Sequence, residues 1–270
     1  MKNVIIIGSA NIYNEKYCPK NKKTFEKVDE TLKSLQKILE KLKIKVLKPS
    51  KESPGELCRS LWVRDTSLNV DNRLYLIPHM VNISRRNRQP EAEVDTLPIE
   101  VKGFAKRISS NIILDGGDVI QDNNIIYIGK GRRTGTSGLL WLKSEFPEKH
   151  IIQINHESLH LDSCFNVLPN KRVIYSKRYI KFLPTYVKSN YEVICVEDYI
   201  DKTASPELAT NILIFKNNLI AADLKKFEKL YKHLEDLGYD MHYVPFYNLY
   251  RDHGGVRCLT SWYKVDNEIV

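Results

Sequence analysis

Several widely separated residues of this chain carry side chains that could act together in covalent catalysis. Cys258 offers a thiol, whose ionised form is a strong nucleophile, and His160 offers an imidazole that can exchange a proton near neutral pH. Asp65, Asp115 and Asp162 add three carboxylates. Each alone has an ordinary structural explanation, because a single cysteine is more often a small buried hydrophobe and single aspartates mostly occupy turns or the surface. A catalytic role therefore depends on whether the fold brings these groups together.

A repeat in the chain gives these residues equivalent positions. Five segments share one plan, in which an apolar strand, a short turn rich in Asn and Asp, and a second apolar strand follow one another. Such turns predict hairpins, since Asn and Asp tolerate the left-handed backbone conformation. The five turns are Asp71-Asn72, Asn123-Asn124, Pro169-Asn170, Asn217-Asn218 and Asp266-Asn267. Counting back roughly seven to ten residues from each turn gives Asp65, Asp115, His160 with Asp162, Asn211 and Cys258.

The stretches between the hairpins combine a helix with a further strand. Residues 25–42 and 224–237 have apolar side chains spaced by three and four, which predicts amphipathic helices, and Gly238 would end the second one. Residues 137–143 and 184–189 resemble shorter helices. A ββαβ unit cannot bury its faces alone, so we expect five of them to close into a ring. The predicted fold is a five-module α/β propeller; the alternative is a doubly wound sheet, for which no G-x-G-x-x-G loop is present.

Composition limits the classes of protein to which this chain could belong. With 270 residues, of which 42% are hydrophobic, we expect one catalytic domain over residues 1–270. The net charge of +9 comes largely from lysines on the polar sides of two predicted helices, so no nucleic-acid partner is expected. No apolar run approaches a membrane span, and the five cysteines, odd in number and without a C-x-x-C pair, predict free thiols. We expect a cytoplasmic protein without membrane contact, metal or cofactor; a homodimer stays open.

Six motifs, in chain order, resemble those of the guanidine-modifying superfamily, the penteins. Each is similar to a family pattern: aromatic-x-R-D, R-x-R-x-x-E, (L/M)-(E/D)-G-G-D, G-x-S-x-R-T, H-L-D and G-G-x-x-C. In this chain they are Trp62-Val63-Arg64-Asp65, Arg86-Asn87-Arg88-Gln89-Pro90-Glu91, Leu114-Asp115-Gly116-Gly117-Asp118, Gly129 to Arg133-Thr134, Leu159-His160-Leu161-Asp162 and Gly254-Gly255-Val256-Arg257-Cys258. The resemblance covers residues from about 62 to 260 and implies a five-module propeller.

The resemblance also implies roles for individual residues. Cys258 would be the nucleophile, His160 the general acid and base, and Asp115 the residue that holds His160. Asp65 and Asp162 would grip the guanidinium nitrogens. The contacts for a substrate α-carboxylate would be Arg88 and Arg133.

The implied activity is cysteine-dependent hydrolysis of a guanidino small molecule, arginine or a close derivative. A covalent S-alkylthiouronium intermediate would give a ureido product such as citrulline. The H-L-D ending in Asp162 resembles enzymes of unmethylated guanidines, whereas dimethylarginine hydrolases usually carry H-L-K. Gly135 stands where many relatives have Asn, a departure from the family pattern. Two alternatives stay open: an amidinotransferase acting on arginine, and a basic propeller without catalysis that binds nucleic acid.

Overall fold

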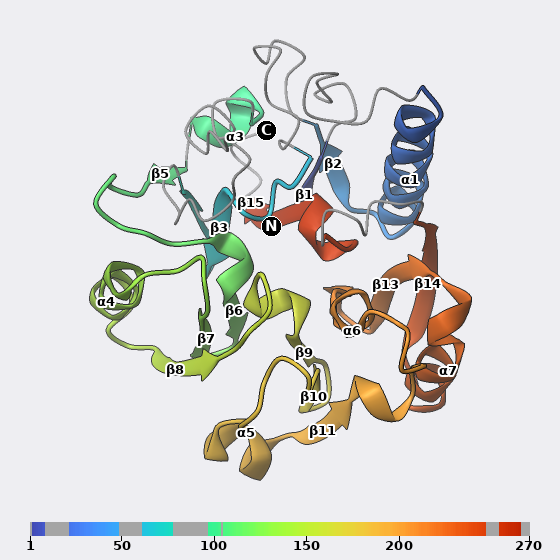
Figure 1. The fold of residues 1–270 in the computed structure, drawn as a ribbon. Coiled ribbons are helices and arrows are strands. Elements are labelled where there is room, and N and C mark those ends of the chain that lie inside the picture. The colour runs from blue at the N-terminus through green and yellow to red at the C-terminus, as the bar shows by residue number, and fades with distance from the viewer. Residues whose placement is uncertain are drawn as a thin grey trace.

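The computed structural model describes residues 2–8, 22–48, 61–77, 97–103, 105–246 and 254–265. Within these residues the strands form five three-stranded sheets, which lie around a common centre (Figure 1). The sheets are β15 (Thr260–Val265), β1 (Lys2–Ile7) and β2 (Lys45–Leu47); β3 (Ser67–Val70), β4 (Arg73–Leu76) and β5 (Lys106–Arg107); β6 (Val119–Asp122), β7 (Ile125–Lys130) and β8 (His150–Asn155); β9 (Phe165–Leu168), β10 (Arg172–Tyr175) and β11 (Glu192–Cys195); and β12 (Leu213–Phe215), β13 (Asn218–Asp223) and β14 (Asp240–Pro245).

Each sheet repeats one topology. Its first two strands are antiparallel, and its third is parallel to the second and follows it through a helix. The connecting helices are α1 (Lys22–Lys41), α3 (Ile99–Lys102), α4 (Thr136–Glu145), α5 (Thr185–Asn190) and α7 (Glu228–Asp236). The predicted five-module α/β propeller is therefore confirmed, and the doubly wound alternative is wrong.

The hairpin turns adopt the backbone conformation that their composition predicts. Asp71, Asn72, Asn123 and Asn170 have φ between 49° and 63°, in the left-handed region that Asn and Asp tolerate. In the fifth sheet the positive φ falls on Lys216, one residue before the predicted pair. The fifth predicted turn, 266–267, lies outside the described residues.

The two ends of the chain complete one module together. Strand β15, which follows Cys258, pairs antiparallel with β1, so that Ile5 lies opposite Trp262 and Ile7 opposite Thr260. The strand expected beyond the fifth turn is thus supplied by the start of the chain. Residues 4–7 are at most 3% exposed, so this first strand is buried.

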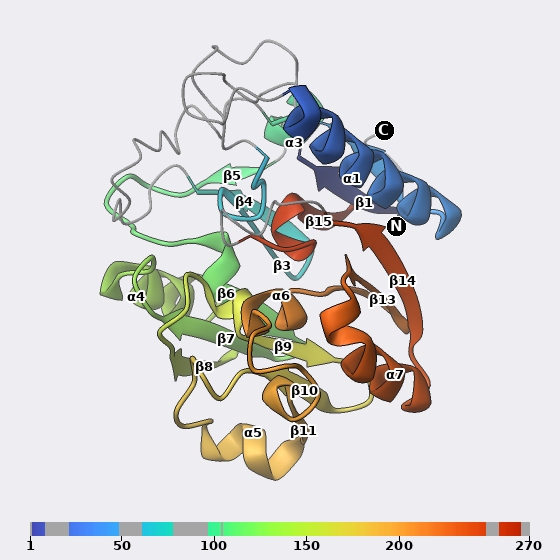
Figure 2. The same cartoon turned by 45° about the vertical axis from the view of Figure 1, so that its right-hand side comes forward.

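The helices cover the outer faces of the sheets (Figures 1 and 2). Helix α1 buries Val28, Leu32, Leu35 and Leu39 at the predicted spacing of three and four, each contributing about 1.5–3 kcal/mol. The Thr31 hydroxyl donates to the carbonyl of Pro245 at 2.6 Å, which ties α1 to β14 of the neighbouring module. None of the helices among the described residues combines the length and apolar character that a membrane crossing needs.

The segments before each hairpin differ from the prediction of extended strands. Four of them contain short helical segments. These are the 3₁₀ turns η2 (Gly116–Asp118), η3 (Leu161–Ser163) and η7 (Arg257–Leu259), and the α-helix α6 (Pro206–Thr210). A strand would alternate its side chains between two faces. Side chains that these segments carry or flank, among them Asp162, Asn211 and Cys258, instead lie close to one another.

Candidate active site

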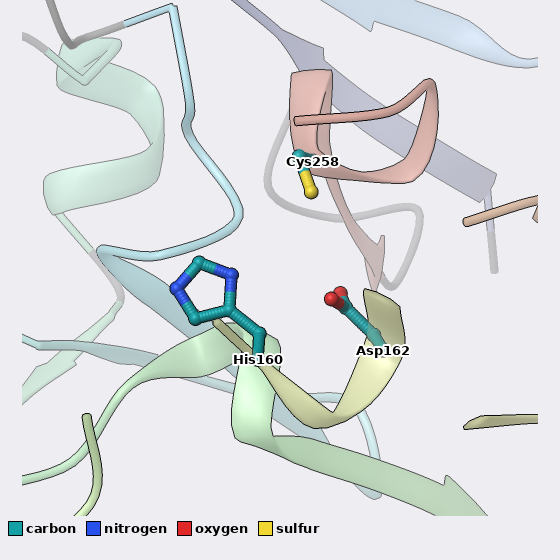
Figure 3. A group of neighbouring side chains, drawn as sticks. All are labelled: His160, Asp162 and Cys258. Atoms are coloured by element: carbon teal, nitrogen blue, oxygen red, sulfur yellow. The ribbon is translucent and has the colours of Figure 1, made fainter. Parts of the chain in front are cut away.

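Two of the predicted catalytic residues and one predicted substrate-binding residue meet where these turns converge. A sulfur, a ring nitrogen and a carboxylate oxygen from Cys258, His160 and Asp162 all lie within 4.8 Å of one another. In Figure 3 the Cys258 sulfur points toward the space between the His160 ring and the Asp162 carboxylate. All three are buried, at 2%, 2% and 0% exposure. The convergence that the sequence register predicts is therefore present.

His160 is held from two sides by carboxylates. Its Nε2 lies 3.2 Å from Oδ2 of Asp115, and its Nδ1 lies 3.9 Å from Oδ1 of Asp65. Burial alone would lower the pKa of His160, but the charges of Asp115 and Asp65 outweigh it and raise that pKa well above its ordinary value. The ring is therefore an imidazolium near neutral pH and can donate a proton.

Asp115 is positioned by the glycines that follow it. Its side chain caps η2 by accepting a hydrogen bond from the Gly117 amide at 2.9 Å. A Cβ on Gly117 would lie 2.8 Å from Cγ of His160, so only glycine lets the imidazole pack this closely. The Asp-Gly-Gly sequence thus brings Asp115 and His160 together.

Asp162 is held by two arginines that the sequence analysis left without a role. Nε of Arg64 lies 3.3 Å and Nε of Arg257 3.5 Å from the same oxygen, Oδ2. Burial raises the pKa of Asp162, while Arg64 and Arg257 oppose that rise. The other oxygen, Oδ1, is buried and has no hydrogen-bond partner among the residues that the structure describes. This oxygen can accept an N–H from a bound ligand.

Arg133 lies in the same site but is engaged differently from its expected role. Its NH2 is 3.0 Å from Oδ2 of Asp115 and 3.8 Å from Oδ2 of Asp65. The structure thus pairs it with two of the carboxylates, and its contact with a substrate α-carboxylate stays a prediction. Arg88, with the whole R-x-R-x-x-E segment, lies outside the described residues.

The surroundings of Cys258 favour the neutral thiol. Burial and the Asp162 charge raise the pKa of Cys258, and the hydrogen bond with His160 lowers it. Nδ2 of Asn211 lies 3.2 Å from the sulfur as a hydrogen-bond donor. A cation bound between Asp162 and Cys258 would favour the thiolate, because it would offset the carboxylate's charge.

Two neighbours of the site, Cys164 and His156, make structural contacts. Cys164 is fully buried, and its thiol donates to the carbonyls of His160 and Leu161 at 3.7 and 3.4 Å. His156 is buried with Nε2 3.3 Å from Oδ1 of Asp118. His253 lies outside the described residues.

The same side chains include two groups whose composition could hold a metal ion. They are His160, Asp162 and Cys258, and Asp65, Asp115 and His160. A cation in either group would compete with arginines already paired to the carboxylates, Arg64 and Arg257 in the first and Arg133 in the second. The arrangement suits a planar cation that can take up the Asp162 Oδ1 atom.

Two known proteins are similar in sequence to this chain, and no family model matches it. The uncharacterized protein YkgA of Bacillus subtilis (strain 168) is 30% identical over 208 residues, which cover 76% of this chain and 69% of that protein. The N(G),N(G)-dimethylarginine dimethylaminohydrolase of Streptomyces coelicolor is 27% identical over 129 residues, 43% of this chain and 50% of that enzyme.

Solved structures share the fold over nearly the whole chain. SxtG, an amidinotransferase from Microseira wollei, has a TM-score of 0.74 at 19% identity and covers 96% of this chain and 93% of its own. A dimethylarginine dimethylaminohydrolase from Pseudomonas aeruginosa complexed with citrulline has a TM-score of 0.72 at 16% identity. It covers 97% of this chain and 100% of its own. The N-terminal domain of ArgZ, a cyanobacterial arginine dihydrolase, gives 0.70 at 14% identity, over 97% of each chain. Kinship in sequence and a common architecture lead to one assignment: the chain belongs to the superfamily of guanidine-modifying enzymes known as penteins.

Proposed function

We propose that this protein is a cysteine-dependent hydrolase of a small guanidino compound, with free arginine or a close derivative as substrate. The observation that carries the proposal is the convergence of Cys258, His160 and Asp162 within 4.8 Å. The buried Oδ1 of Asp162 supports a guanidinium ligand, because within the described part of the chain no donor reaches it and a guanidinium supplies the N–H that it can accept. A cytoplasmic setting, expected from the sequence, would keep the nucleophile reduced.

The first half of the reaction makes a covalent intermediate. A guanidinium is planar and cationic, so carboxylates can align it and orient its carbon toward sulfur. Its charge lowers the pKa of the Cys258 thiol, which loses its proton to water, and the thiolate then forms a C–S bond. His160, as imidazolium, protonates the departing nitrogen as the C–N bond breaks. The result is an S-alkylthiouronium on Cys258 and a neutral His160.

Hydrolysis of this intermediate restores the enzyme. Neutral His160 takes a proton from a water molecule that attacks the thiouronium carbon. Collapse of the adduct breaks the C–S bond and leaves a ureido compound, while the proton of the added hydroxyl passes to the departing sulfur and restores the thiol. With arginine as substrate the products are citrulline and ammonia.

A second candidate function is amidino transfer. The support for it is the likeness to SxtG, an amidinotransferase with a TM-score of 0.74. The same covalent intermediate would then be attacked by an amine acceptor instead of water. Access of water to the thiouronium carbon decides between the two outcomes.

One experiment separates the candidates. The enzyme is incubated with arginine labelled with ¹³C at the guanidino carbon, with and without an amine such as glycine. Labelled citrulline supports hydrolysis, and label on the acceptor supports transfer. Cys258→Ser serves as the control that abolishes either product. If neither product forms from arginine, methylarginines or agmatine, while a polynucleotide binds with steep salt dependence, the proposal of catalysis is wrong.

A further inference from the structure

We propose that Asn211 is a further catalytic group of this site, whose side-chain amide orients the nucleophile and stabilises its thiolate. The inference rests on the proposed function insofar as it takes Cys258 as the nucleophile. Neither the motifs of the family resemblance nor the roles derived from them include Asn211. What singles it out is a set of four contacts around the sulfur.

Both the oxygen and the nitrogen of the Asn211 side-chain amide form hydrogen bonds. Its Oδ1 accepts hydrogen bonds from the backbone amides of Arg257, at 2.9 Å, and Cys258, at 3.3 Å. Its Nδ2 donates to the sulfur of Cys258, at 3.2 Å, and to the carbonyl of Asp162, at 3.3 Å. Asn211 is only 2% exposed. One side chain therefore links the nucleophile's backbone, its sulfur and the segment that carries Asp162.

The orientation of this amide follows from its partners. Backbone N–H groups can only donate, so the atom that faces Arg257 and Cys258 must be the oxygen. The NH₂ group must then face the sulfur. Asn211 is the residue at the C-terminus of α6, and its own backbone amide donates to the carbonyl of Glu207. The helix end and the two donors together leave the amide one orientation.

The nucleophile segment is shaped to reach Asn211. A Cβ on Gly255 would lie 2.4 Å from Oδ1 of Asn211, so this close approach requires glycine. Gly255 precedes the η7 turn that carries Cys258. The glycine therefore lets the backbone amides of this turn come within hydrogen-bonding distance of a side chain from another module.

A neutral donor is well suited to this position. Among the residues that the structure describes, the charged groups near the sulfur are Asp162, Asp65 and His160, with Arg64 and Arg257 on the far side of Asp162. A lysine in place of Asn211 would also stabilise the thiolate, but its charge would repel a guanidinium substrate. An amide N–H stabilises the anion without adding net charge. Asn211 thus favours the thiolate at no cost to binding a cation.

The test separates the donor from the acceptor. In Asn211→Asp the side chain keeps oxygens for the backbone amides of the η7 turn but loses the N–H that faces sulfur. The rate of alkylation of Cys258 by iodoacetamide is measured against pH, with the modified cysteine identified by mass spectrometry and Cys258→Ser as the blank. We expect the midpoint to rise by at least about one pH unit, so that alkylation below the midpoint slows about tenfold or more. A midpoint equal to that of the wild type would overturn the inference.

A matched pair of variants covers the case in which Asn211→Asp gives no cooperative thermal transition. Asn166 is another buried asparagine whose Nδ2 donates to the carbonyl of Asp162, at 3.0 Å, but its second bond goes to the carbonyl of Thr210. Asn211→Ala should raise the midpoint and Asn166→Ala should leave it unchanged. Equal midpoints in the two variants would show that the contact with sulfur has no effect on the thiol.

Turnover of a guanidine is measured in parallel. A raised midpoint without any turnover in the wild type would contradict the proposed function and leave the role of Asn211 standing. Turnover in the wild type with an unshifted midpoint would support the proposed function and contradict the role of Asn211. If the wild type turns over the guanidine and the midpoint is raised in Asn211→Asp, kcat should fall in this variant. KM should not rise, because the added carboxylate attracts the cationic substrate.

Discussion

Replacing Asp162 by asparagine should make the thiol more reactive and the enzyme less active. Asp162 lies beside Cys258, where its charge raises the pKa of the thiol. It also neutralises Arg64 and Arg257, which would remain as two cations near the sulfur. The substitution keeps the shape of the side chain and removes only its charge. Both changes in charge favour the thiolate.

The magnitude follows from the distance. Asp162 and Cys258 have their polar atoms within 4.8 Å, so two full charges at an effective dielectric constant of about 20 interact by about 3.5 kcal/mol. Solvent and side-chain relaxation reduce this energy to about 1.4–2.8 kcal/mol, which corresponds to a roughly ten- to hundredfold shift of the thiol–thiolate equilibrium toward the thiolate. The guanidinium loses one charge-assisted hydrogen bond, worth about 1.5–3 kcal/mol, and kcat/KM for the substrate should fall about 10- to 100-fold.

Iodoacetamide alkylation at pH 7.5 measures the first effect, because the reagent is neutral and reacts with the thiolate. Alkylation of Cys258 should be about tenfold or more faster in Asp162→Asn than in the wild type. Leaving two buried arginines without their carboxylate costs about 3–5 kcal/mol of stability, so the melting temperature should fall by about 10 °C. Both rates are therefore measured well below that temperature.

A second buried carboxylate provides the control. Asp118 is also fully buried, and its oxygens accept from the Leu161 amide and the Thr134 hydroxyl rather than from arginines. Asp118→Asn should leave the alkylation rate of Cys258 near that of the wild type. If folded Asp162→Asn reacts with iodoacetamide at the wild-type rate or more slowly, the electrostatic account of this site is refuted.

Three other substitutions test the remaining parts of the site. Cys258→Ala should lower kcat by about 10³-fold or more while calorimetry shows substrate binding retained; near-normal turnover would exclude Cys258 as the nucleophile. Gly117→Ala places a Cβ 2.8 Å from Cγ of His160, and we expect a loss of about 1–3 kcal/mol in thermal or denaturant unfolding together with a lower kcat. The raised pKa of His160 contributes stability that is fully present below its unfolded value of about 6.5 and is lost as pH rises through the folded value. The melting temperature should therefore fall with pH above about 6.5 more steeply in the wild type than in His160→Gln, and parallel slopes would contradict this assignment.

The modules were predictable because their signals are local. Asn123 and Asn170 take the left-handed conformation that turns require, and the periodic apolar residues of α1 and α7 fall on their buried faces. Gly238, expected at the end of α7, has a φ of 90°. Each of these features depends on residues a few positions apart, so the pattern in the chain suffices.

The surroundings of Asp162 were not predictable in the same way. Arg64 is 98 positions from Asp162 and Asn211 is 47 positions from Cys258. Such contacts depend on how modules pack and which way each side chain turns, and neither is set by local periodicity. Two signals were present nonetheless: Asn211 shares the register of the catalytic residues, and Arg257 is a charged residue directly before the nucleophile.

The first sheet gives the nucleophile an unusual dependence on distant sequence. Strand β15 starts two residues after Cys258, and its neighbour on one side is the strand formed by residues 2–7. The segment that carries Cys258 is thus followed directly by a strand that pairs with the other end of the chain. If β1 separates from β15 on warming, the Cys258 sulfur should lose its alignment. His160 lies in a module formed from the middle of the chain and should keep its position. The enzyme would then lose activity at a lower temperature than that at which the whole fold unfolds. The temperature at which activity is lost would measure the stability of the β1–β15 pairing.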